Sequence, residues 1–227
     1  MNYQKTFYYD DGKTIDYTNE YNPQTGKLTK QTQYYPDGKT KKSVVEYSPD
    51  GKITKQTFFN SDGSILREDF YNPQTEELIK ETHYHSDGET IYYIIKYEYD
   101  PQTGKLNKVT FYRTDGTLET TIEYNPQTDN ETKETWFHKD GKTIDSITKY
   151  EYDPQTGKLN KVTFYRTDGT LETTIEYNPQ TDKRTKQTFF NSDGKTIFYI
   201  TKYEYDPQTG KITKTTYYNP DGSIKSV

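Results

Sequence analysis

The chain contains no cysteine and no alanine, a single methionine, a single tryptophan and three histidines. The absence of cysteine excludes disulfides and thiol chemistry. With no alanine and seven leucines among 227 residues, the chain is a poor candidate for helices, which these residue types favour. No apolar run approaches the roughly 18 residues of a membrane-spanning helix, so the sequence predicts no membrane span.

Aliphatic residues are also scarce. Leu, Ile, Val and Phe together make 37 residues, about 16% of the chain, and the mean hydropathy is −1.23. Such values usually indicate disorder. The 25 tyrosines reverse that conclusion, because each can bury a large ring while its hydroxyl stays in water. Tyr, Phe, Thr and Ile dominate, and their preference for strands predicts an all-β protein.

The charges are mixed, with a net charge of −5 and no basic block. Because nucleic-acid surfaces usually show a basic stripe, we predict no nucleic-acid partner. The segment Met1-Asn2-Tyr3-Gln4 lacks the apolar region of a signal peptide. Two localisations therefore remain open, the cytosol and a secreted or cell-surface location after removal of a leader.

Internal repetition is the strongest signal in the sequence. Residues 96–129 and 149–182 are identical over 34 positions, at an offset of 53. The same unit begins again at Lys202, and divergent copies fill the rest of the chain. We therefore predict a single repeat domain over residues 1–227, with a 53-residue super-repeat of four strands that is clearest at 97–149 and 150–202.

Two turn sequences alternate along the chain. Asp-Gly occurs at nine of the turns, and glycine accepts the positive φ that a tight hairpin requires. Asn/Asp-Pro-Gln-Thr occurs at seven others, where proline sets φ, and Ser48-Pro49-Asp50-Gly51 replaces it once. These 17 turns separate 18 segments, of which Ile91–Tyr99 is predicted to be a longer strand.

Short connections between all segments predict about 18 antiparallel strands in a meander, each pairing with its sequence neighbours. Alternation along the longer strand places several large side chains on one face, namely Ile91, Tyr93, Ile95, Tyr97 and Tyr99. No other segment remains to cover that face. We expect tandem hairpins in an elongated, twisted meander, either as a single layer or as a coiled sheet whose tyrosine-rich face lines an interior.

The segments YNPQTGKL at Tyr21–Leu28 and YYPDGK at Tyr34–Lys39 resemble a tyrosine-rich repeat family of unknown function from phytoplasmas, and the resemblance covers nearly the whole chain. It implies a bacterial protein exported towards a plant or insect host, with no known activity and no site residues to transfer. Shorter segments resemble other repeats. Tyr97–Leu106 is similar to the YD repeats of Rhs and teneurin shells, and Phe58–Gly63 is similar to choline- and glucan-binding wall repeats.

Candidate metal ligands are few. His83 and His85 flank Tyr84, and on a strand they would face the same way. The remaining histidine, His138, is about two hairpins away, so we predict no metal site and no cofactor. The carboxylates of the Asp-Gly turns are explained by turn geometry, because neither an EF-hand loop nor a GGxGxD repeat is present.

No Ser-His-Asp arrangement, phosphate-binding loop or zinc motif occurs in the sequence. Carboxylates that recur in equivalent positions also differ from the single asymmetric constellation that catalysis needs. We therefore predict no catalytic residues and a protein that is not an enzyme.

Tyrosine is the one surface chemistry that recurs at a fixed period, either as the core substitute of the fold or as a platform for a partner. We predict a binding surface formed by Tyr97, Tyr99, Tyr112, Tyr124, Tyr150, Tyr152, Tyr165 and Tyr177. The predicted function is that of a non-catalytic interaction or scaffold protein, an exported effector or surface protein that binds a host protein or self-associates through the tyrosine-rich face. The alternatives are a carbohydrate- or cell-wall-binding module that uses tyrosines with Trp136, and a structural spacer.

Deletion of residues 97–149, one full period of 53, is expected to leave a folded and shorter protein. The reason is that each repeat of a meander contacts mainly its neighbours, so stability is close to a sum of local terms. Far-UV circular dichroism should keep its β signature, and urea should still unfold the variant cooperatively. Loss of the unfolding transition would contradict the local-repeat interpretation and indicate a closed shell.

Overall fold

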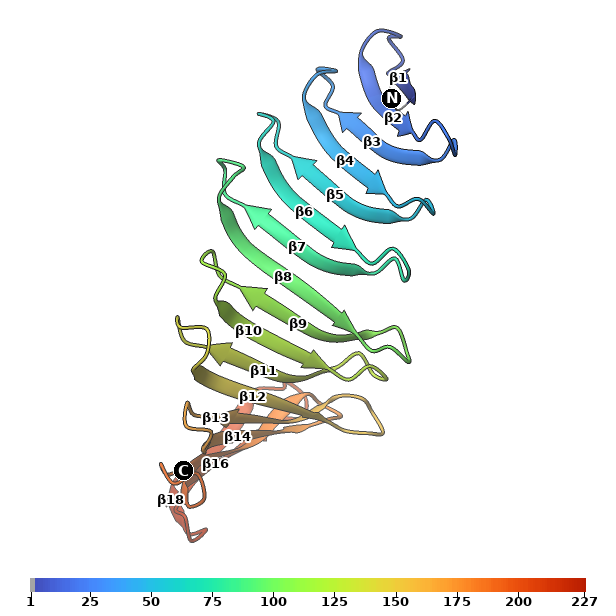
Figure 1. Cartoon of the computed structure of the whole chain (residues 1–227). Coiled ribbons are helices and arrows are strands. Elements are labelled where there is room, and N and C mark those ends of the chain that lie inside the picture. Colours follow the sequence, from blue (N-terminus) through green and yellow to red (C-terminus); the bar gives the residue numbers. More distant parts are fainter. Residues whose placement is uncertain (1–2) are drawn as a thin grey trace. The chain divides into compact units, whose positions relative to one another are not determined.

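The computed structural model describes residues 3–227, which form one antiparallel sheet of 18 strands joined by short turns (Figure 1). Met1 and Asn2, on which part of the leader argument rests, lie outside the described residues. No helix long and apolar enough to span a membrane occurs within residues 3–227. By its internal contacts the chain divides into two compact units, residues 1–98 with 110–117 and residues 99–109 with 118–227.

The predicted strand number and the predicted longer strand are both confirmed. The first nine strands are β1 (Tyr3–Tyr8), β2 (Ile15–Tyr21), β3 (Leu28–Tyr34), β4 (Lys41–Tyr47), β5 (Ile53–Phe59), β6 (Ile65–Tyr71), β7 (Leu78–Tyr84), β8 (Ile91–Tyr99) and β9 (Leu106–Tyr112). The others are β10 (Leu118–Tyr124), β11 (Glu131–Phe137), β12 (Ile144–Tyr152), β13 (Leu159–Tyr165), β14 (Leu171–Asn178), β15 (Lys183–Phe190), β16 (Ile197–Tyr205), β17 (Ile212–Tyr218) and β18 (Ile224–Ser226). β8, β12 and β16 have nine residues, whereas most other strands have seven. The strands pair in chain order as a meander that is not closed into a barrel.

In both turn types, a side chain of the turn accepts hydrogen bonds from residues of the same turn. In the Asp-Gly turn at Asp168, the carboxylate accepts hydrogen bonds from the backbone N–H and the hydroxyl of Thr170. In the longer loop, Asp153 Oδ1 accepts from the backbone N–H groups of Gln155 and Thr156, while its carbonyl accepts from Gly157, whose φ is +71°. Because these contacts span at most four residues, each turn can form from local sequence alone.

A β-bulge precedes the aromatic residue at the end of most strands. Between β14 and β15, Glu176 lies opposite Lys186 but Tyr177 lies opposite Arg184, so Thr185 is an extra residue. The Thr185 hydroxyl donates to the carbonyl of Glu176 at 3.1 Å, and this bond satisfies an acceptor at the irregularity. Bulges of this kind increase the local twist and change which side chains lie side by side.

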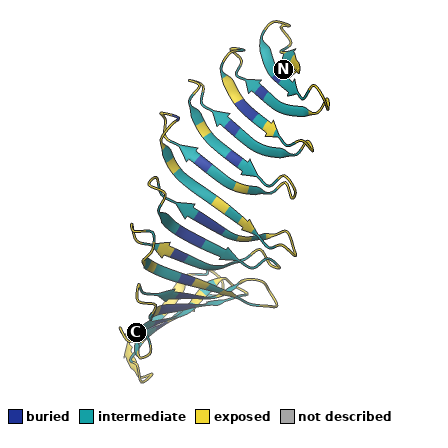
Figure 2. Cartoon of the chain, in the orientation of Figure 1, coloured by how far each residue is buried: buried dark blue, intermediate teal, exposed yellow. Residues whose placement is uncertain are grey.

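Most of the buried residues are small side chains in the middle of the strands, visible as dark bands in Figure 2. In the first unit Thr18, Thr32, Val44 and Thr57 lie opposite one another on successive strands and are 4–7% exposed. In the second unit, Thr163, Thr174 and Thr188 form a similar row. The buried hydrophobic side chains of residues 3–227 are Val44, Val109, Val162 and Ile175. Cross-strand pairs, worth about 0.2–1 kcal/mol each, therefore replace a conventional core.

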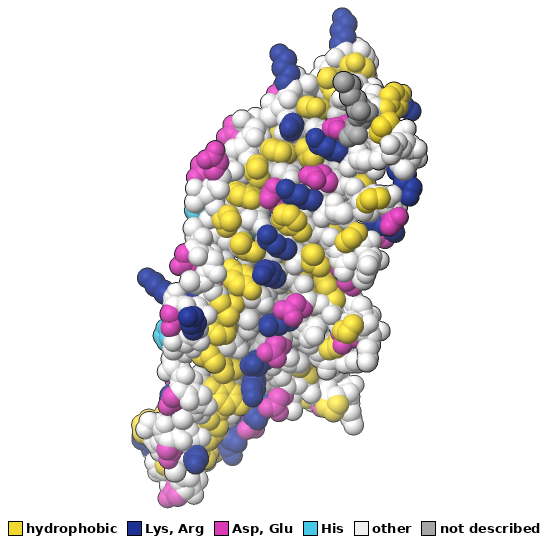
Figure 3. Space-filling model, viewed as in Figure 1, with side chains coloured by type: hydrophobic (Ala, Val, Ile, Leu, Met, Phe, Trp, Pro, Cys, Tyr) yellow, Lys and Arg dark blue, Asp and Glu magenta, His cyan; other side chains and the backbone are white. Residues whose placement is uncertain are grey.

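The pairing defines two faces in the second unit. Tyr150 lies opposite Val162, which lies opposite Ile175, and we call this side the tyrosine face. Lys149 lies opposite Thr163 on the other side, which we call the lysine face. The same names apply to the equivalent sides of the first unit. Figure 3 shows Lys and Arg side chains interspersed with hydrophobic ones over the sheet.

Two glycines, both in Asp-Gly turns, differ in their surroundings, and this difference gives a test of the turn geometry. Gly169 has a φ of +80°, and a Cβ added to it would meet no atom within 4 Å. A Cβ on Gly194, whose φ is +64°, would instead lie 2.7 Å from the backbone nitrogen of Leu171. Gly169→Ala is expected to cost about 1–2 kcal/mol, from positive φ alone. Gly194→Ala should cost more, since the neighbouring backbone must also shift. Equal urea midpoints for the two variants would contradict the close approach at Gly194.

Candidate functional site

The structure places six of the eight predicted tyrosines on the tyrosine face. Ile122 lies opposite Glu134, and Glu134 lies opposite Thr148, so Tyr124 shares the face of Tyr150 and Tyr152 by alternation. Tyr177 lies on the same face, two residues beyond Ile175. In the first unit, Tyr97 lies on the side of His83 and Tyr93, and its hydroxyl donates to Glu81 at 2.9 Å. Tyr99 follows Tyr97 by two residues along β8.

The other two predicted tyrosines, Tyr112 and Tyr165, lie on the lysine face, where lysines of the same chain cover them. The Lys96 ammonium lies 4.9 Å from the centroid of the Tyr112 ring, and Lys149 lies 5.0 Å from that of Tyr165. Lys202 repeats the contact over Tyr218 at 5.0 Å. Since their ring faces already hold a cation, Tyr112 and Tyr165 serve the fold through cation–π contacts.

Tyr150 and Tyr152 line a groove of about 500 Å³ between two neighbouring loops of the second unit. The walls come from the loop that begins at Asn125 and from the loop Asp153–Gly157, with Asn130 and Thr132 at the start of β11. The Tyr150 hydroxyl lies 3.4 Å from Glu134 Oε2 and also interacts with Glu131. Burial, reinforced by these two carboxylates, raises the pKa of Tyr150, so this phenol stays protonated as a donor.

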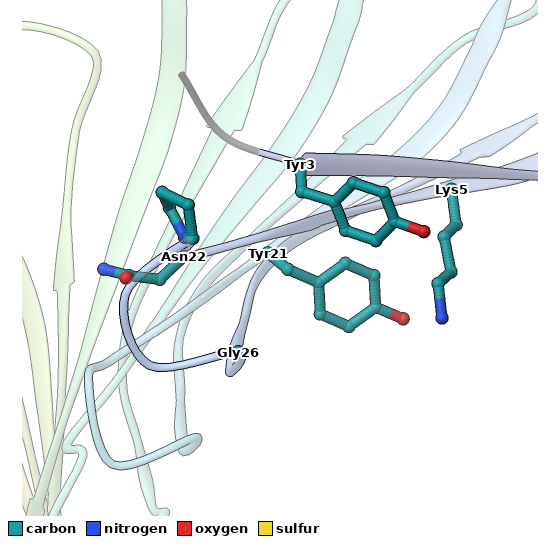
Figure 4. A pocket seen from close by; sticks show the side chains of 6 residues that line it. Tyr3, Lys5, Tyr21, Asn22 and Gly26 are labelled. Carbon is teal, nitrogen blue, oxygen red and sulfur yellow. The ribbon is translucent and has the colours of Figure 1, made fainter.

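A smaller groove of about 310 Å³ lies at the first hairpin, where Tyr3, Lys5 and Tyr21 meet the loop that begins at Asn22 (Figure 4). The two tyrosine rings have centroids 6.0 Å apart. The Lys5 ammonium lies 5.7 Å from the Tyr3 centroid and 5.5 Å from the Tyr21 centroid. A lysine of the chain thus lies over tyrosine rings at this groove, as lysines do on the lysine face.

A charged cluster on the tyrosine face of the first unit is absent from the sequence-based expectations. Asp69 is 3% exposed and receives two hydrogen-bond-length contacts from Arg67, at 2.8 and 2.9 Å. Arg67 also lies over the Phe58 ring, 4.7 Å from its centroid. Burial raises the pKa of Asp69 despite the opposing effect of Arg67. Because Arg67 neutralises Asp69 within the sheet, the cluster maintains the packing rather than presenting a free carboxylate.

The two histidines of the metal hypothesis contact different tyrosine rings. His83 stacks on Tyr93 at 4.2 Å between centroids, and its Nε2 lies 2.7 Å from Glu81. His85 follows β7 and lies 4.9 Å from the ring of Tyr92. Within residues 3–227, no three His, Cys, Asp or Glu side chains are arranged so that they could hold a metal ion.

Sequence reasoning missed the acidic side of the groove at Tyr150. The two copies of the super-repeat are identical through Asp129 and Asp182, and they diverge from the next residue onward, where NETKET in one copy corresponds to KRTKQT in the other. The sequence does show a change of charge at these equivalent positions of the two copies. Only the fold shows that this change lies at a groove, because it brings Asn130 and Glu131 beside tyrosines about 20 residues further along the chain.

The fold and its recurring tyrosine surface define a tandem β-hairpin repeat protein. The chain belongs to the family described as protein of unknown function (DUF2963), whose model matches at residues 8–57, 59–111, 112–164, 165–204 and 202–227. The predicted repeat family of unknown function is confirmed at this level. No curated protein matches the chain.

Solved structures show only distant likeness. The chain is similar to S. aureus TarM at 12% identity and a TM-score of 0.34, over 55% of this chain and 22% of TarM. It is also similar to a chain of the Photorhabdus luminescens Tc holotoxin pore at 16% identity and a TM-score of 0.37, over 97% of this chain and 14% of the toxin chain. The chain thus spans less than a quarter of either protein.

The turn carboxylates predict a loss of stability in acid. Hydrogen bonds from the hydroxyl and backbone of Thr143 and from the backbone of Lys142 lower the pKa of Asp140 from 3.8 to about 2. A carboxylate whose pKa is lower in the folded state contributes stability above its unfolded pKa and loses it as the pH falls through the folded value. The urea midpoint is therefore expected to be constant from neutral pH down to about pH 5 and to fall between about pH 4 and pH 2.

Asp140→Asn should weaken this acid dependence, because the amide cannot titrate. Asp10→Asn is the matched control, since Asp10 lies in a turn but receives no hydrogen bond in the described part of the chain. An acid dependence that is unchanged in Asp140→Asn but altered in Asp10→Asn would contradict the assignment.

Proposed function

We propose that this protein is a non-catalytic interaction protein that binds an extended protein partner through the tyrosine face. The observation behind the proposal is that half-buried tyrosines recur on this face at the 53-residue period, with Tyr177 equivalent to Tyr124 and Tyr203 equivalent to Tyr150. Tyrosine suits partner surfaces because its ring is apolar and its hydroxyl forms hydrogen bonds.

The contrast between the two faces around the groove at Tyr150 supports this assignment. Tyr165 and Tyr218 on the lysine face are each covered by a lysine of the chain. Tyr150 and Tyr152 instead line an open groove. A repeated surface of this kind suits a partner that contacts several repeats at once, with a modest contribution from each, and it suits a small substrate poorly.

From the resemblance in the turn sequences, we also propose that the protein is bacterial, of the kind found in phytoplasmas, and acts after export as an effector or surface protein. The alternative partner is a second copy of the chain, bound through the same face. Both proposals share the prediction that the tyrosine face is the contact surface.

The proposal is tested with two sets of substitutions and a partner captured from a host extract and identified by mass spectrometry. Replacement of Tyr124, Tyr150, Tyr152 and Tyr177 by threonine is expected to weaken partner binding about tenfold or more, because each ring contributes modestly. The matched control replaces Tyr112 and Tyr165 by threonine and should leave affinity nearly unchanged. Circular dichroism and urea unfolding establish that both variants fold.

Affinity should also rise when residues 150–202 are duplicated, since a further copy of the contact surface is added. A single substitution that abolishes binding, combined with an affinity that is indifferent to the number of repeats, would show a local site and overturn the proposal.

Carbohydrate binding is a second candidate function, favoured by Trp136. This side chain lies opposite Thr120 on the tyrosine face and is 41% exposed. Because it is the single tryptophan of the chain, its fluorescence reports on its surroundings directly. A saturable change in that fluorescence on addition of wall polysaccharides, without binding of protein partners, would favour this function over the first.

A further inference from the structure

We call the groove at Tyr150 the earlier copy and its equivalent one 53-residue period further along the chain the later copy. The later copy holds a lysine of the chain. The Lys183 ammonium lies 5.0 Å from the centroid of the Tyr205 ring. A Cβ placed on Gly210 would lie 2.8 Å from Lys183 Nζ. The ammonium therefore occupies the space between the tyrosine ring and the loop that ends at Gly210.

In the earlier copy the same space is open. Asn130 stands where the later copy has Lys183, and Gly157 and Tyr152 correspond to Gly210 and Tyr205. Asn130, Tyr152 and Gly157 all line the groove of about 500 Å³. The asparagine side chain is too short to reach the ring as the lysine does, so the position of the ammonium is left to another molecule.

The charge beside the earlier groove is also reversed. Glu131 and Glu134 replace Arg184 and Gln187 of the later copy, and together with Asn130 for Lys183 they exchange two positive charges for two negative ones. Neither glutamate pairs with a lysine or arginine within residues 3–227, whereas the nearby Asp129 and Glu151 pair with Lys105 and Lys161 at 2.9 and 3.0 Å. Burial, and to a smaller extent Glu134, raises the pKa of Glu131, so a cation at the groove would relieve an unfavourable negative charge.

We propose that the groove formed by Tyr150, Tyr152 and Asn130, with Glu131 and Glu134 beside it, binds a primary ammonium group, the side chain of a lysine on the partner protein. The ammonium would lie over the Tyr152 ring as Lys183 lies over Tyr205. Cation–π attraction and two carboxylates are the chemistry that recognises such a group. That the ammonium belongs to a protein partner rests on the proposed function. The inference adds that a lysine of this partner contacts the tyrosine face at this repeat.

The test uses the full chain labelled with ¹⁵N and a small probe, Nα-acetyl-lysine methylamide. Titration should shift the amide resonances of Asn130, Glu131 and residues 150–153 and 155–157. The same compound acetylated on Nε lacks the charge and should cause no shift. Added salt should weaken binding of the charged probe, because the carboxylates lie at a groove open to solvent.

Reciprocal substitutions between the two copies provide matched variants that the fold already tolerates. Asn130→Lys places the chain's own ammonium in the groove and should weaken probe binding about tenfold or more. The triple variant Lys183→Asn, Arg184→Glu and Gln187→Glu should create a second groove, so that the protein binds two probe molecules. Equal shifts with the neutral probe, or unchanged binding in Asn130→Lys, would overturn the proposal.

The same variants separate this inference from the proposed function. If the captured partner depends on the tyrosines of the tyrosine face but binds Asn130→Lys as tightly as the unmodified chain, the lysine site is wrong and the proposed function stands. If the probe binds in the groove but substitution of the tyrosines leaves partner binding unchanged, the ammonium site stands and the proposed function fails.

Discussion

Cross-strand contact between side chains on a sheet is the interaction on which this structure depends. Residues 3–227 supply strands and short turns, and each strand pairs with the strands before and after it in the sequence. Burial must then come from neighbours within the sheet. The middle of most strands accordingly carries a small side chain, most often threonine, between larger ones, and Thr32, Thr82 and Thr201 are 3–4% exposed for this reason. Tyrosine supplies the area that aliphatic residues supply elsewhere.

Because burial comes from neighbours within one sheet, the two faces differ in how their tyrosines are covered. On the lysine face, Lys149 and Lys202 lie over the rings of Tyr165 and Tyr218, so these tyrosines have cation–π partners within the chain. On the tyrosine face, burial raises the pKa of Tyr124, Tyr150 and Tyr152, but the rings at the groove keep open space beside them. Surface that the fold leaves without an internal partner is where a binding function can arise without any loss of packing.

Near-identity between repeats makes their differences informative. A repeat protein can conserve the residues that pair strands and vary those that face a partner, because the two sets lie at different positions of each strand. Asn130 and Lys183 occupy equivalent places beside Tyr152 and Tyr205, yet one leaves a groove open and the other fills it. The fold tolerates both choices, which indicates that packing does not dictate this position.

The local features of the fold follow from the sequence by itself. Asp-Gly and Pro-Gln-Thr turns act over at most a few residues, so the number of strands, their chain order and the greater length of β8, β12 and β16 can be counted from the sequence. The family of unknown function could likewise be inferred from the turn signatures. The grouping of side chains across strands could not, because it depends on where bulges such as those before Tyr152 and Tyr177 shift the pairing by one residue. Such a shift moves a side chain to the other face, so only the tertiary structure decided that Tyr150 and Tyr165 lie on opposite faces and that Glu131 and Glu134 lie beside Tyr150.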